Sequence, residues 1–173
     1  PMSDKYPNLT PYNYCANNPV KFIDPDGKDV WEINGQGEVV NRIKDKTQDA
    51  FYMVSKDADG NYQRTFTTDA DGNKYYKSVS FDYGTVTDTK KAGWFSGNAT
   101  SFSVTSEAAG ADLFKFFADN TKIEFGLINT KDNGSLVMTN HKEGSVEASK
   151  TAQKLSDKGQ TVTSILHNHP NNS

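Results

Sequence analysis

Two copies of the segment Asp-Ala-Asp-Gly-Asn, at residues 57–61 and 69–73, constrain the fold of this chain more than any other feature. Gly adopts positive φ without steric cost, so Asp-Gly favours tight turns. The stretches around these turns are short and rich in aromatic and β-branched residues, a composition typical of β-strands. We therefore predict successive hairpins and assign residues 28–104 to an antiparallel β-meander. Within it, the Gly-, Ser- and Thr-rich residues 84–104 are expected to form a loop or a boundary.

The same two segments place carboxylates two residues apart, as calcium-binding loops do. They lack the third acidic position and the closing glutamate of an EF-hand, so hairpin turns are favoured over calcium sites. Two copies are also too few to indicate a repeat array.

From residue 105 onward the pattern changes to that of helices alternating with strands. Ser106 is a suitable N-cap, and apolar residues recur at helical spacing until about Asn120. Strands are predicted next at 122–130 and 136–140, and the Asn-Gly pair between them marks a hairpin turn.

A second helix and a final strand complete the predicted α+β fold. The helix is expected to be capped by Ser145 and to end at Lys158-Gly159, where a cationic last turn meets a glycine stop. The strand follows at about 160–167. Residues 105–173 thus form a helix-strand-strand-helix-strand unit, and residues 1–27, dense in Pro and Asn, are an extended linker.

Composition excludes several classes of protein. With 34% hydrophobic and 24% charged residues and a formal net charge of -3, the chain has no basic surface suited to nucleic acid. No apolar stretch approaches the roughly 20 residues of a membrane span, so we expect a soluble chain. Cys15 is the only cysteine, which excludes internal disulfides and thiolate-rich metal sites. It is expected to be a packing residue rather than a nucleophile.

His167 and His169 stand one residue apart at the end of the last predicted strand. Side chains at i and i+2 leave the same face of a strand, so both imidazoles can reach one metal ion. Imidazole suits zinc, and a catalytic zinc has three protein ligands with one position open for water. Only two candidate ligands are visible here, so we expect the sequence to be a fragment whose metal site is incomplete.

Glu124 is the candidate general base. Alternation along the predicted strand puts Glu124 and Gly126 on the face away from the apolar residues, where the carboxylate is expected to have open space. Zinc held by His167 and His169 would lower the pKa of a bound water to about 7. Glu124 would then take the proton, and the hydroxide would attack a carbonyl.

Each of these features has a plainer explanation when it stands alone. A His-x-His pair is more often a pair of polar residues at a strand end, and a lone strand glutamate is usually solvated. Their order along the chain, together with the turn at Pro170, favours the metal site. His141 is expected to be only a surface residue at the end of a hairpin.

The segments Glu124-Phe125-Gly126-Leu127 and His167-Asn168-His169-Pro170 together resemble the JAMM (JAB/MPN) metallopeptidase family, which has a cytidine-deaminase-like fold. The resemblance covers about residues 105–173, where the order of helices and strands is also that of the family. It implies Glu124 as general acid/base, His167 and His169 as zinc ligands, and hydrolysis of a peptide or isopeptide bond. The family's serine and third-ligand aspartate have no counterpart, and Ser173 comes too soon to be that serine. The module is therefore expected to be truncated at its C-terminus, to bind zinc weakly or not at all, and to be poor or inactive as a catalyst, whereas the intact module would hold zinc and hydrolyse its substrate.

The stretch from Tyr6 through Asn17-Asn18-Pro19 to Asp24-Pro25-Asp26-Gly27 resembles the end of the core of bacterial Rhs/YD-repeat proteins. In that family the motif closes a shell of repeats, a variable toxin domain follows it, and some members cut themselves there by means of aspartates. The resemblance implies a self-cleavage role for Asp24 or Asp26, although Lys28 replaces a residue that is often large and apolar. Asp-Pro-Asp-Gly is also simply good turn chemistry.

The two resemblances together imply the C-terminal effector or toxin region of an Rhs-type protein. Such regions are delivered outside the producing cell in competition between bacteria, so the implied partners are a peptide or isopeptide substrate, the Rhs shell and an immunity protein. The alternative is a non-catalytic binding or structural module, in which exposed aromatic residues of the meander recognise a partner or pack inside the shell.

Overall fold

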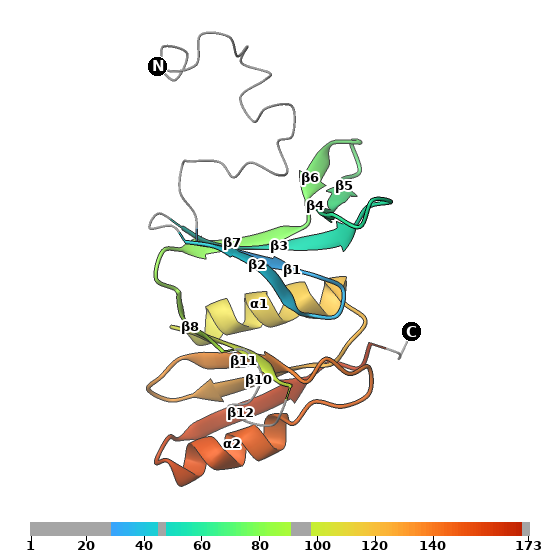
Figure 1. Ribbon diagram of the computed structural model, residues 1–173. Helices are drawn as coiled ribbons and strands as arrows, with labels where there is room; N and C mark the ends of the chain where they lie inside the picture. Colours follow the sequence, from blue (N-terminus) through green and yellow to red (C-terminus); the bar gives the residue numbers. More distant parts are fainter. Residues whose placement is uncertain (1–28, 45–47, 91–97, 171–173) are drawn as a thin grey trace.

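A computed structural model of the chain describes residues 29–44, 48–90 and 98–170. The layers stack in the order first sheet, helix α1, second sheet, helix α2 (Figure 1). Sheets and helices occur together, which confirms the α+β class. Residues 1–27, with Cys15 and the cleavage candidates Asp24 and Asp26, lie outside the described part.

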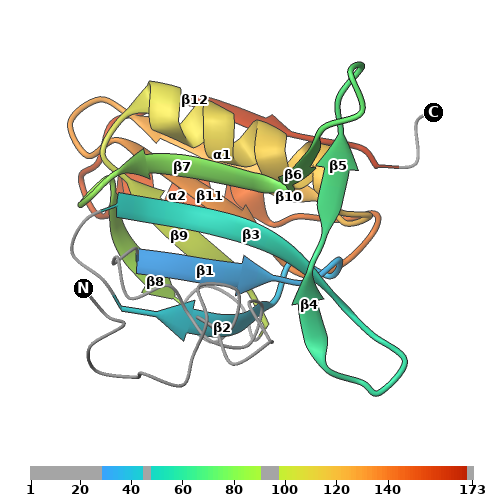
Figure 2. The same cartoon turned by 90° about the horizontal axis from the view of Figure 1, so that it is seen from above.

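The first sheet has five strands in the order β2-β1-β3-β4, with β7 also paired to β3. Its strands are β1 (Asp29–Ile33), β2 (Val39–Ile43), β3 (Gln48–Lys56), β4 (Tyr62–Arg64) and β7 (Ser78–Asp82). A two-stranded arm of β5 (Phe66–Thr68) and β6 (Lys74–Tyr76) projects beyond it (Figure 2). The turns at 57–61 and 69–73 join β3 to β4 and β5 to β6, so both predicted hairpins are confirmed.

The predicted meander is wrong at β1 and β3, which pair in parallel rather than antiparallel. Their register sets Trp31 beside Phe51 and Ile33 beside Met53. The two aromatic rings stack with centroids 4.8 Å apart, and all four side chains are buried in one core. Alternation within a strand predicts which face is buried, but it does not say which strand becomes the neighbour.

The second sheet is antiparallel throughout, in the order β12-β10-β11-β9-β8. Its strands are β8 (Val86–Lys90), β9 (Thr100–Val104), β10 (Phe125–Thr130), β11 (Ser135–Thr139) and β12 (Val162–His167). Residues 84–104, predicted as a loop or boundary, therefore supply two of its strands. The sheet also crosses the predicted division at 104/105. The segment was predicted as a loop because most of its residues are polar or glycine. Two of its residues, Phe102 and Val104, nevertheless face the core and are fully buried.

Helix α1 spans Glu107–Asn120 and begins as predicted, because Ser106 Oγ accepts a hydrogen bond from Ala109 N at 3.1 Å. Helix α2 spans Ala148–Asp157, and its N-cap is Glu147. The predicted cap at Ser145 is wrong. Glu147 N instead donates to Asn140 Oδ1 at 2.8 Å, which ties the approach to α2 onto the end of β11.

Phe117 lies at the centre of a hydrophobic core shared by the two sheets. Its ring centroid is 5.6 Å from that of Phe51 in β3, 5.4 Å from that of Phe102 in β9 and 4.6 Å from that of Phe125 in β10. All four side chains are fully buried. The first sheet, α1 and the second sheet thus pack as one unit rather than as separate modules.

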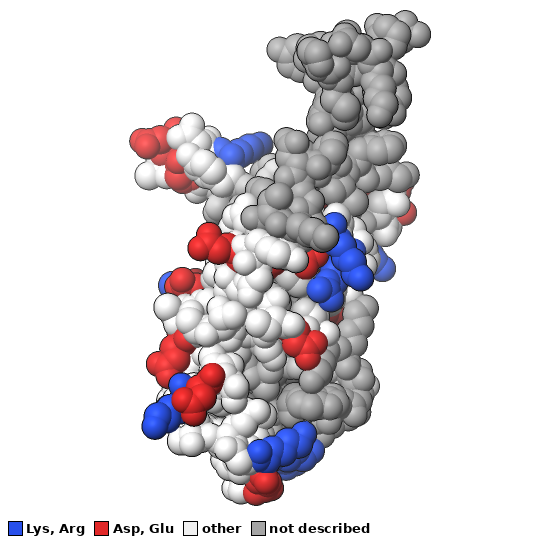
Figure 3. All heavy atoms as spheres, turned by 90° about the vertical axis from the view of Figure 1, so that its left-hand side faces the viewer, with Lys and Arg blue, Asp and Glu red and all other residues white. Residues whose placement is uncertain are grey.

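The surface carries charges of both signs. On the face drawn in Figure 3, acidic and basic side chains of the described residues are interspersed. No helix in the described part of the chain is long and apolar enough to cross a membrane.

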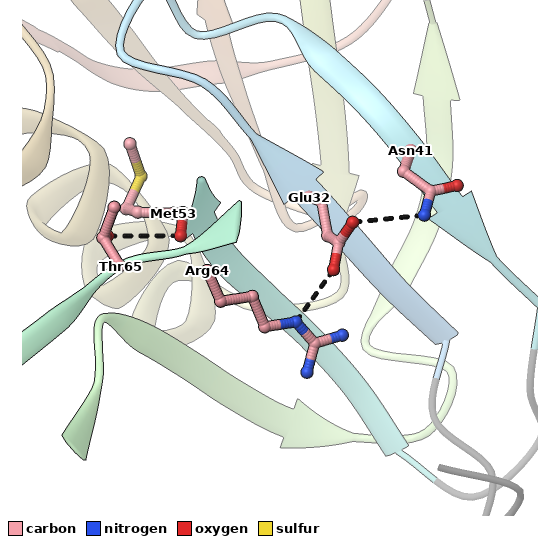
Figure 4. Close-up of polar contacts among 5 residues, drawn as sticks. All are labelled: Glu32, Asn41, Met53, Arg64 and Thr65. Carbon is pink, nitrogen blue, oxygen red and sulfur yellow. Dashed lines mark hydrogen bonds and ion pairs between the residues drawn. The ribbon is translucent and has the colours of Figure 1, made fainter. Parts of the chain in front are cut away.

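Strand β4, which leads into the arm, is held by a polar cluster on the first sheet (Figure 4). Arg64 Nε donates to Glu32 Oε1 at 2.8 Å, and Asn41 Nδ2 donates to Glu32 Oε2 at 3.1 Å. The Arg64 guanidinium also lies 3.9 Å from the centroid of the Tyr52 ring. The residue at the end of β4, just before the arm, therefore contacts β1 and β3.

Asp49 joins the two sheets through one buried carboxylate. It is 1% exposed, and its Oδ2 accepts a hydrogen bond from Val86 N in β8 at 2.7 Å. Burial raises the pKa of Asp49 above its ordinary value of 3.8, and the hydrogen bond from Val86 opposes the shift only in part.

Asp49→Asn is therefore expected to change how stability depends on pH. A raised folded pKa means that the folded state binds the proton more tightly than the unfolded chain does. The stability contributed by Asp49 is present below pH 3.8 and is lost as the pH rises through the folded pKa. Asn keeps an acceptor for Val86 and does not ionise. In denaturant unfolding, the free energy of unfolding of the variant should therefore rise relative to that of the wild type as the pH increases from about 3 to 7. A difference that stays constant over this range would contradict the assignment.

Candidate functional site

The candidate site lies at one end of the second sheet, where β10 begins and β12 ends. Antiparallel pairing sets Gly126 opposite His167. Glu124, just before β10, is thereby brought to the same end as His167 and His169. The two segments are distant in sequence and adjacent in space only because their strands pair.

Glu124 and His169 are in direct contact. Glu124 Oε1 lies 3.1 Å from His169 Nδ1, and the carboxylate side chain is 7% exposed against 56% for the imidazole. The contact fits an ionised Glu124 that accepts a hydrogen bond from Nδ1, which puts the lone pair of a neutral His169 on Nε2.

His167 completes the cluster. Its ring centroid lies 4.6 Å from that of His169, with the ring planes at 78°. The three residues that the sequence singled out are thus brought together. Two imidazoles and a carboxylate are donors suited to zinc. Within residues 29–44, 48–90 and 98–170, however, no group of three or more His, Cys, Asp or Glu is arranged to hold a metal ion.

The surroundings of Glu124 differ from the open space that we predicted. Strand β10 begins only at Phe125, and Glu124 itself is 5% exposed. A Cβ added at Gly126 would lie 2.7 Å from Ala148 Cβ, at the start of α2, and 3.3 Å from Val146 Cγ2. Gly126 therefore permits close packing of α2 on the sheet rather than access to the carboxylate.

The backbone of Glu124 is held on both sides by residues that sequence reasoning missed. Glu124 N donates to Lys142 O at 2.8 Å, and Thr139 Oγ1 donates to Glu124 O at 2.7 Å. Asn168 also bonds to the residues before and after Glu124. One feature of the sequence could have indicated the role of Asn168. It lies between two histidines, and alternation along an extended segment directs its side chain away from theirs.

His141 is more than the surface residue that we predicted. Its φ is 58°, and its Nδ1 lies 2.7 Å from Gln36 O and its Nε2 2.9 Å from Thr100 Oγ1. The imidazole thereby links the turn between β1 and β2 to β9. Its contacts are structural, and they do not include Glu124, His167 or His169.

Residues 102–173 match the model of the family described as JAB-like toxin 1. Neither the curated proteins nor the solved structures contain a match. The matched region begins in β9 and includes Glu124, His167 and His169. This part of the chain is therefore similar to JAB-like toxins, and the match supports a JAB-like toxin effector domain at residues 102–173.

Proposed function

We propose that residues 102–173 form a zinc-dependent hydrolase of peptide or isopeptide bonds that acts as a toxin. The observation that carries this proposal is the contact between Glu124 and His169, beside His167, at one end of the second sheet. A buried carboxylate paired with an imidazole, next to a second imidazole, is a combination suited to metal-assisted hydrolysis.

His167 and His169 are the residues that would hold the ion. In zinc sites a ligating imidazole commonly donates its other N–H to a carboxylate, which fixes the tautomer and the ring orientation. The contact of His169 Nδ1 with Glu124 Oε1 has this form and leaves Nε2 for the metal. Zinc, when bound, polarises a carbonyl oxygen and acidifies water.

Glu124 would move the proton. Its Oε1 holds His169, and Oε2 is the atom that would take a proton from the attacking water and return it to the leaving nitrogen. Burial of the carboxylate keeps bulk water from competing for that proton.

The cellular role follows from the resemblance of residues 1–27 to the end of an Rhs core. We infer that the toxin domain lies at the C-terminal end of an Rhs-type protein, is enclosed by its shell and is delivered outside the producing cell. Its partners would be the shell, a peptide or isopeptide substrate in the target cell and an immunity protein in the producer.

A non-catalytic binding module is the second candidate, and the arm favours it. Phe66 and Tyr75 in the arm are 50% and 53% exposed, and Tyr62 in the neighbouring β4 is 39% exposed, although aromatic rings of this size are usually buried. A binding module would recognise its partner through this arm and would have no need of zinc.

Zinc titration by calorimetry separates the two candidates. In a version of the protein extended past Ser173, the wild type is expected to bind zinc, and His167→Ala is expected to bind it about tenfold more weakly or worse, because half of the imidazole donors are lost. His141→Ala is the matched control, since it removes a histidine outside the cluster, and it should bind zinc as the wild type does. Equal zinc uptake by the wild type and His167→Ala would remove the metal assignment and leave the binding module.

A further inference from the structure

Asn168 occupies the position between the two histidines of the site. Successive side chains of an extended segment point to opposite faces, so Asn168 points away from His167 and His169. It is also less exposed than either histidine. A polar side chain turned toward the sheet at this point requires hydrogen-bond partners.

Those partners are the two residues that flank Glu124. Asn168 Oδ1 accepts from Phe125 N at 2.6 Å, and Asn168 Nδ2 donates to Ile123 O at 3.4 Å. The backbone N of Asn168 donates to Phe125 O at 3.2 Å. One residue therefore binds the peptide unit before Glu124 and the peptide unit after it.

These hydrogen bonds set the distance between Glu124 and the two histidines. Glu124 lies between the two peptide units that Asn168 holds, and each histidine is one residue from Asn168 along the chain. A shift of Glu124 relative to His169 would have to break a hydrogen bond to Asn168. The His169 side chain is more than half exposed, so packing around its ring does not by itself hold the ring 3.1 Å from Glu124.

We propose that Asn168 is a positioning residue that holds the Glu124 carboxylate against His169 Nδ1 and so presents His169 Nε2 to a metal. Asn168 acts through the backbone around Glu124 and touches neither the metal nor the substrate. Its effect on zinc rests on the proposed function, whereas its effect on the His169 tautomer does not.

The test compares Asn168→Ala with Asn129→Ala in the whole chain. Asn129 also links β10 to β12, because its Nδ2 donates to Ser164 Oγ at 2.9 Å, but it lies at the opposite end of the strand pair. Both variants lose a side-chain link between these two segments, and Asn129→Ala also loses the hydrogen bond from Ser135 Oγ, so a purely structural role predicts at least as large an effect from Asn129→Ala.

The first readout is the tautomer of His169 in the metal-free protein, from long-range proton-nitrogen NMR correlations of the ring. The wild type and Asn129→Ala are expected to carry the proton on Nδ1, whereas Asn168→Ala should shift toward the Nε2 tautomer. The second readout is zinc affinity by calorimetry, which should fall roughly 10–100-fold in Asn168→Ala and stay near the wild-type value in Asn129→Ala.

The outcomes are distinguishable. If the wild type binds no zinc, the proposed function fails, and the tautomer readout still decides the role of Asn168. An unchanged tautomer in Asn168→Ala, or the same shift in both variants, would overturn the inference. Should Asn168→Ala fail to fold, Asn168→Asp keeps an acceptor for Phe125 N and replaces the donor to Ile123 O with a charged oxygen that the carbonyl repels. It should shift the tautomer in the same direction, and no shift would again overturn the inference.

Discussion

Phe117→Ala is expected to lower the free energy of unfolding by about 3–5 kcal/mol, the usual range for removing a buried phenylalanine ring. The ring is fully buried and contacts aromatic rings from both sheets, so the resulting cavity would open between the layers rather than collapse at the surface. Domains of this size commonly have a total stability of about 5–15 kcal/mol. The variant should therefore be marginally folded.

The same substitution tests whether the chain is one folding unit. Because one core spans the first sheet, α1 and the second sheet, denaturant unfolding followed by circular dichroism should show a single transition that moves to lower denaturant in Phe117→Ala. Phe114→Ala, on the same helix but only partly buried, is the control and should have a smaller effect. Two separate transitions, of which only one responds to Phe117, would instead support a division near residue 104.

The predictions that held depended on local signals. The Ser106 cap, the helix it begins, the hairpin turn near Gly134 and both Asp-Ala-Asp-Gly-Asn turns are fixed by residues within a few positions of one another. Gly134 illustrates the reason. Its φ is 69°, and a Cβ there would clash with Val104 O, so only glycine fits this turn.

The predictions that failed depended on contacts between distant segments. The parallel pairing of β1 with β3 and the inclusion of β8 and β9 in the second sheet follow from which strands share the core. The start of α2 depends on a hydrogen bond from Glu147 to Asn140, not on the nearest cap-forming residue, Ser145. Alternation and capping rules carry no information about such partners.

In the candidate site, too, the sequence predicted some features and not those that depend on contacts between distant segments. Residue type and order along the chain predicted that Glu124, His167 and His169 converge, and the structure places Glu124 against His169 and His169 beside His167. Their roles in zinc binding and catalysis stay predictions. The hydrogen bonds of Asn168 cross 43 and 45 positions of sequence, so the residue that aligns the site could not be identified before the strands were paired.

In the intact protein, Glu124→Gln is expected to lower hydrolysis by roughly 10²–10⁴-fold, the usual contribution of a general acid-base group. Gln has nearly the same shape, and its amide oxygen can accept the hydrogen bond from His169 Nδ1, so the fold and the ring orientation should persist. An amide cannot take up and return the proton, so the loss should appear in kcat rather than in KM. The measurement is zinc-dependent cleavage of a library of quenched fluorescent peptides that carry α-peptide or lysine isopeptide bonds.

Glu143→Gln is the matched control, because Glu143 is an exposed carboxylate on the connection between β11 and α2. It should leave both hydrolysis and the unfolding midpoint unchanged. Glu124→Gln should likewise keep its unfolding midpoint and lose no more than the roughly 10–100-fold in zinc affinity that weakening the carboxylate partner of a ligating imidazole costs. Full activity in Glu124→Gln would remove the residue from the chemistry. A loss of zinc affinity well beyond that range, with the fold intact, would instead make Glu124 a third ligand beside the two imidazoles, and the group that moves the proton would have to lie elsewhere.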